Sequence, residues 1–292
     1  MEKKLLVVLV VVGLCSTAAL ALDPMGPATA GLKQGQFSAG LDYAYSQMEL
    51  KHDGSYSWDV DYGSYTDTVP LKYKHEDTQM HKAYFNLGYG VADWLEVFLR
   101  LGGANLYGKR TPRYSEGVDG PDTWLDETIY DSSTGFAYGF GGKATVWEPS
   151  PELKVGVLAQ ASWANVDYDI WFTGVDDLGN LWGVQSPGQL DFWEVQIALG
   201  VTYQLAPKFS VYGGPFYYWF SGDFDHKGSG MYDPENLDYD MAIKGSYDVE
   251  DVGCFGGYLG AQIAVTDNIA WNAECQGAKG ALALGTSLVW KF

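Results

Sequence analysis

Residues 190–205 read LDFWEVQIALGVTYQL, and large apolar side chains occupy every second position of this stretch. The positions between them carry small or polar residues. Successive side chains of a β-strand point to opposite faces, so a period of two predicts a strand with one apolar face and one polar face. The apolar face comprises Trp193, Val195, Ile197, Leu199, Val201, Tyr203 and Leu205.

The same alternation recurs along the chain, and no long stretch after Gln36 keeps the 3.6-residue period of a helix. It predicts ten strands, at residues 36–50, 77–91, 94–108, 134–147, 153–171, 190–205, 208–221, 252–265, 268–276 and 281–292. Tight turns alternate with long connections, which is typical of an up-and-down sheet with its long loops at one end. The long connections are residues 51–76, 109–133, 172–189 and 222–251, whereas the fifth connection at that end, residues 277–280, is tight.

The polar face of these strands decides between a soluble sheet and a membrane barrel. It is rich in Gly, Ala, Ser and Gln with isolated charges, which suits a crowded interior better than a water-facing surface. An open sheet edge in lipid would leave backbone groups unpaired, so strands that cross a membrane close into a barrel. We predict an all-β fold, a transmembrane up-and-down antiparallel β-barrel of about ten strands over residues 36–292, with eight or twelve strands as alternatives. An apolar exterior and a polar lumen also explain the mean hydropathy of −0.14.

The first 21 residues are typical of a secretory signal peptide. The basic start MEKK is followed by an apolar run over residues 5–14 and by small residues that end at Ala21. Cleavage is expected after Ala21, and residues 22–35 are assigned to a periplasmic N-terminal segment.

Two cysteines lie beyond the signal peptide, Cys254 and Cys275. In a hairpin that turns at Thr266 and Asp267, Cys275 pairs near Leu259 and Cys254 near Gly280. The two side chains are then on opposite faces and out of register, so we expect no disulfide.

The last strand, ALALGTSLVWKF at residues 281–292, alternates up to a C-terminal phenylalanine. It resembles the recognition strand of bacterial outer-membrane β-barrel proteins. The resemblance implies a location in the bacterial outer membrane, contact with its lipid, and an assembly signal read by the barrel assembly machinery. This signal is formed by Leu288, Trp290 and Phe292.

Charged residues on the inner face of the predicted strands form a candidate lumen charge cluster. Its members are Glu96, Arg100, Lys143, Lys154, Glu194 and Glu274. Buried charges need partners, so one interpretation is a set of ion pairs that fills a narrow barrel. The other is a water-filled lumen in which these charges set ion preference.

The chain has 37 acidic and 18 basic residues and a formal net charge of −19. This charge repels phosphate backbones, so nucleic-acid binding is not expected. The acids gather in the long loops, which predicts an acidic extracellular surface with divalent cations as counter-ions. No phosphate-binding loop or metal-ligand motif is found in the sequence, so no cofactor and no metal site are expected.

The predicted barrel also resembles one enzyme family in part. Omptin proteases are ten-stranded outer-membrane barrels whose rim carries an Asp-x-Asp pair and an Asp-x-His pair. Asp59 and Asp61 resemble the first pair, but Asp225 and His226 are adjacent and would face opposite sides of a strand. We therefore rank a structural or small-pore, porin-like barrel first, a surface adhesion or binding barrel acting through its loops second, and an omptin-like protease third, and expect no enzyme.

Overall fold

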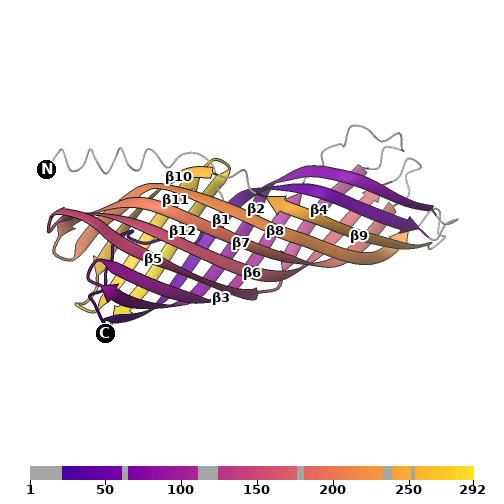
Figure 1. Cartoon of the computed structure of the whole chain (residues 1–292). Coiled ribbons are helices and arrows are strands. Elements are labelled where there is room, and N and C mark those ends of the chain that lie inside the picture. The colour runs from indigo at the N-terminus through magenta and orange to yellow at the C-terminus, as the bar shows by residue number, and fades with distance from the viewer. Residues whose placement is uncertain (1–21, 61–64, 111–123, 176–180, 233–238, 251–253) are drawn as a thin grey trace.

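The computed structural model describes residues 22–60, 65–110, 124–175, 181–232, 239–250 and 254–292. Its regular elements are β-strands, joined into one closed antiparallel sheet (Figure 1). None of the described residues forms a helix of the length and apolarity needed to cross a membrane. The strands are β1 (Phe37–Val60), β2 (Tyr65–Ala92), β3 (Leu95–Arg110), β4 (Trp124–Ser132), β5 (Gly135–Ser150), β6 (Leu153–Val175), β7 (Leu181–Ala206), β8 (Phe209–Tyr232), β9 (Tyr239–Glu250), β10 (Cys254–Ala264), β11 (Ile269–Ala278) and β12 (Ala281–Lys291).

The twelve elements make ten passages of the chain through the barrel wall. β4 and β5 both pair with β3 and β6, and only Ser133 and Thr134 separate them. β9 and β10 likewise both pair with β8. Each of the ten predicted segments coincides with a strand, so the predicted barrel and its strand number are confirmed.

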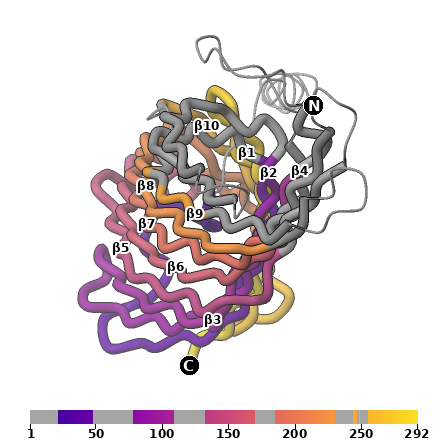
Figure 2. The backbone as a smooth tube through the Cα atoms, turned by 90° about the vertical axis from the view of Figure 1, so that its right-hand side faces the viewer, coloured from indigo at the N-terminus to yellow at the C-terminus, as the bar shows by residue number. Residues whose placement is uncertain are grey.

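The barrel narrows along its length. β12 pairs with β1 from Ser38 to Met48, and from Lys51 onward the same edge of β1 pairs with β9. The change occurs because the β11–β12 hairpin ends at a tight turn, where Gly280 has a φ of 79° that favours glycine. A ten-strand section, which holds the tight turns and the C-terminus, therefore continues into an eight-strand section made of β1, β2, β3, β4, β6, β7, β8 and β9. Figure 2 shows the strands following one another around the closed ring.

The outward face of the ten-strand section is apolar. Leu41 is 63% exposed and Leu199 is 50% exposed, and the aliphatic side chains are bracketed along each strand by aromatic ones. On β7, for example, Tyr203 and Trp193 lie on either side of Ile197 and Leu199. An apolar band between two aromatic girdles is the exterior of a membrane-spanning barrel.

The polarity of the two faces reverses where this band ends. On β7 the outward residues that follow Trp193 are Asp191 and Gln189, while the inward ones change from Glu194 to Phe192. β6 changes in the same way beyond Trp163. On β8 only the outward face changes beyond Trp219, because its inward face is aromatic on both sides of that residue. The eight-strand section therefore has a polar exterior and an apolar core, as a soluble barrel has. That core comprises Met80, Leu106, Val166, Leu190, Phe192, Phe220 and Phe224.

The cysteine arrangement follows the predicted register. Cys275 pairs with Leu259, and its side chain is partly exposed on the outward face. Cys254 pairs with Tyr218 on β8, and its side chain lies outside the described residues.

Candidate functional site: the lumen

The chain before β1 lies inside the ten-strand section. Leu22, Met25, Ala28 and Leu32 are all buried there. The sequence analysis assigned residues 22–35 to the periplasm, whereas the structure places residues 22–32, here called the luminal segment, within the barrel. The segment has no period of two or 3.6 from which this could be predicted, and its sequence LDPMGPATAGL favours an irregular path.

The strands satisfy the backbone of the luminal segment with their side chains. The carboxylate of Glu274 accepts hydrogen bonds from the Met25 and Gly26 amides, at 2.7 and 2.8 Å. The Arg100 guanidinium donates to the Pro24 carbonyl at 2.6 Å. An irregular segment can be buried in this way because its polar groups find partners.

Five charged side chains form a buried network at the start of the segment, each no more than 4% exposed. The Lys82 ammonium lies 3.2 Å from the Asp23 carboxylate and 2.7 Å from that of Glu194. The Arg100 guanidinium lies 3.1 Å from the Asp42 carboxylate and 4.0 Å from that of Asp23. Because these groups are out of water, each depends on its partners.

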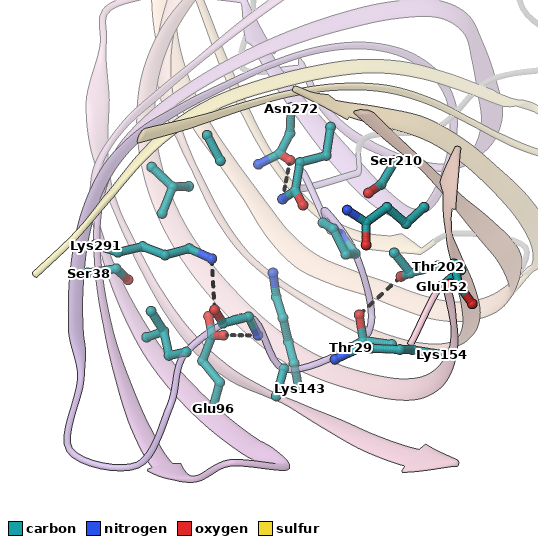
Figure 3. Close-up of a pocket in the computed structure, with 18 of the residues that line it drawn as sticks. Thr29, Ser38, Glu96, Lys143, Glu152, Lys154, Thr202, Ser210, Asn272 and Lys291 are labelled. Carbon is teal, nitrogen blue, oxygen red and sulfur yellow. Dashed lines mark hydrogen bonds between the residues drawn. The ribbon is translucent and has the colours of Figure 1, made fainter. Parts of the chain in front are cut away.

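The opposite end of the segment borders a cavity of about 250 Å³ at the mouth with the tight turns (Figure 3). Gly31 ties it to the wall, since its amide donates to Glu96 at 2.8 Å and its carbonyl accepts from Lys291 at 2.7 Å. Lys143 and Lys154 also line this cavity.

The six residues of the predicted lumen charge cluster fall into two groups. Arg100, Glu194 and Glu274 are buried against the luminal segment, and Glu96, Lys143 and Lys154 line the mouth. Lys154 contacts Glu148 at 3.3 Å and is partly exposed.

The predicted cluster lacks three members of the buried network, Asp23, Asp42 and Lys82. Lys82 could have been found, because it lies four positions from the inward-facing Asn86 on the same strand. Asp23 precedes the first strand and carries no periodic signal.

No protein-family model matches the chain, and no curated protein matches its sequence. Solved structures are similar to it at low identity. The outer membrane protease OmpT from Escherichia coli is 11% identical, with a TM-score of 0.41, over 87% of this chain and 97% of that one. The Ralstonia pickettii toluene transporter TbuX is 11% identical, with a TM-score of 0.36, over 94% and 95%. The outer membrane protein OprG from Pseudomonas aeruginosa is 11% identical, with a TM-score of 0.29, over 90% and 98%.

The chain has the fold of a membrane-spanning β-barrel. Its own architecture carries this conclusion, because the sheet has no open edge in the apolar band and the number of membrane passages is even. Leu288, Trp290 and Phe292, the residues of the predicted assembly signal, are exposed on the outward face at the end of the chain. Their role in assembly stays a prediction.

The residues compared with omptins do not form a catalytic pair. On β8, Asp225 is exposed, whereas His226 is 3% exposed inside the eight-strand section, with its Nδ1 atom 2.8 Å from the Ser186 hydroxyl. The side chains of Asp59 and Asp61 lie outside the described residues. Among the described side chains, no three His, Cys, Asp or Glu residues are grouped to hold a metal ion.

Acidic residues face each other across the outer surface of the eight-strand section. Asp191 on β7 is directly opposite Asp223 on β8, and Asp223 is opposite Asp248 on β9. All three are exposed. This acid row lies beyond the tryptophans that end the apolar band, so it faces water rather than lipid.

Proposed function

We propose that the protein is a closed structural barrel of the outer membrane rather than an open small pore. The luminal segment is the observation that carries the proposal, because it fills the ten-strand section and is held by buried charges. The apolar core then occupies the eight-strand section, and an apolar constriction excludes water and ions.

In this role the barrel raises an acidic surface above the outer leaflet. Residues 1–21 serve as the export signal, Leu288, Trp290 and Phe292 are read by the barrel assembly machinery, and the apolar band contacts outer-membrane lipid. Divalent cations act as counter-ions to the acid row, since like charges directly opposite each other on a sheet repel.

Conductance of the refolded mature chain in planar bilayers tests the proposal. We expect no single-channel steps, in a bilayer where an open porin inserted afterwards does conduct. Reproducible steps whose ion preference changes in Glu96→Gln or Arg100→Gln would show a water-filled lumen and would overturn the closed barrel.

A further inference from the structure

The buried network does not balance in charge. It contains three carboxylates, Asp23, Asp42 and Glu194, and two cations, Lys82 and Arg100. An uncompensated charge out of water is strongly unfavourable. Glu274 does not take part in this balance, because the Met25 and Gly26 amides, the Tyr212 hydroxyl and the Gln276 side chain all donate to it.

The uncompensated negative charge of the network can be assigned to one oxygen atom of Glu194. Oε1 of Glu194 contacts Lys82 and accepts from Ser162 at 3.0 Å, whereas its Oε2 is buried without a hydrogen-bond partner in the described part of the chain. A carboxylate oxygen in this position calls for a donor, and a charged donor would also neutralise the network.

A cation can arise next to this site from the main chain. Leu22 is 1% exposed inside the barrel and is bonded to Asp23, which shares Lys82 with Glu194. Consecutive Cα atoms are about 3.8 Å apart, so the nitrogen of Leu22 lies within one residue of Asp23, a member of the network. The signal-peptide pattern places the cleavage site at the bond between Ala21 and this nitrogen.

We propose that cleavage after Ala21 creates the third cation of the network. Water adds across the Ala21–Leu22 amide, which leaves a carboxylate on Ala21 and an amine on Leu22 that takes up a proton. The resulting α-ammonium stays in the lumen and donates to the free oxygen of Glu194. Export processing thereby completes the closure of the barrel, because only the cleaved chain has a neutral luminal network.

Labelling of the α-amine tests the position of the new terminus. Mass spectrometry of the mature protein should show Leu22 as its first residue. An amine-reactive, water-soluble reagent should modify the Leu22 amine in the unfolded chain and leave it unmodified in the folded barrel, with Lys208 at an exposed turn as the internal positive control. A different first residue, or equal labelling in both states, would overturn the proposal.

A charge-balance experiment tests the pairing itself. The α-amine is acetylated in the unfolded chain near neutral pH. It reacts before the lysines there, because the pKa of an α-amine is roughly 8 and that of a lysine is roughly 10. Free and acetylated chains of wild type and Glu194→Gln are then refolded, and the midpoint of the heat-induced gel shift is measured.

Acetylation should lower the midpoint of the wild type by roughly 5–10 °C. Glu194→Gln should lower the midpoint of the free chain and raise that of the acetylated chain, because it restores neutrality only in the latter. Glu96→Gln at the mouth is the matched control and should shift both chains equally. If Glu194→Gln shifts both chains in the same direction, Glu194 is already neutralised in another way and the proposal fails.

Discussion

Lys82 joins two carboxylates that reach it from separate parts of the chain. Asp23 belongs to the luminal segment and Glu194 to β7, so the ammonium fastens the segment to the wall. Each of the three side chains is almost fully buried. Removing one partner of such a group leaves the others charged and out of water, which is far more unfavourable than losing a surface ion pair.

Replacing this lysine should therefore destabilise the barrel strongly. For Lys82→Met we expect a loss of about 3–5 kcal/mol in the free energy of unfolding, measured by urea unfolding in detergent. Lys154→Met is the matched control, and because its ion pair with Glu148 is partly exposed, it should lose less than about 1 kcal/mol. Equal losses in the two variants would contradict the structural role given to Lys82.

His226 gives the eight-strand section a pH dependence. It lies beyond the apolar band, and burial lowers its pKa from 6.5 to about 4, against a smaller opposite effect of Asp225. Below pH 6.5 an opened section takes up a proton that the closed one does not, so stability is full above pH 6.5 and falls until about pH 4. The loss reaches about 3 kcal/mol. Amide exchange of β7 and β8, measured between about pH 4 and pH 7, reports this loss of stability. His226→Gln should make the stability independent of pH over this range. A wild type whose stability changes as little with pH as that of His226→Gln would contradict the prediction.

At the scale of the strand, the alternation of apolar and polar residues was sufficient to place all ten passages. It could not give their full length. Beyond Trp193 the apolar face of β7 becomes the inward one, so a pattern interpreted for lipid alone ends there, although the strand starts at Leu181. The apolar core of the eight-strand section was not predicted for the same reason, because a polar interior was expected along the whole barrel. Residues 51–60 and 65–76, which the sequence assigned to a long connection, belong to β1 and β2.

The acid row should weaken the pairing of the strands that carry it. Asp223 has an aspartate directly opposite it on each side, so Asp223→Asn removes two repulsions. We expect it to stabilise the eight-strand section by about 0.5 kcal/mol at low salt, measured by amide exchange of β8. Half-molar NaCl should abolish the gain, because exposed charges are then screened. Ser221→Asn on the same face is the control, and a gain that persists in salt would point to a cause other than charge.

For the molecule as a whole, the proposed closure of the barrel depends on two structures in series. The luminal segment fills the section in the membrane, and the apolar core fills the section above it. The first could not be predicted, because an irregular chain is placed by its hydrogen-bond partners and these come from strands far away in sequence, such as Glu274 on β11. The apolar core could be predicted, once the strands are known to continue beyond the lipid, because large apolar side chains then occupy the inward positions.

Removing one closure should therefore leave the other intact. The test uses a chain that lacks residues 22–32 and carries Ser in place of Cys254 and Cys275. A cysteine introduced as Ser162→Cys reports on the membrane section, because Ser162 is buried beside Glu194. We expect a water-soluble maleimide to label it at least tenfold faster than in the chain that keeps the segment. Leu190→Cys, in the apolar core, is the matched control and should stay unlabelled in both chains. Rapid labelling at both positions would mean that the luminal segment also supports the upper core, since its removal would then have opened the whole barrel.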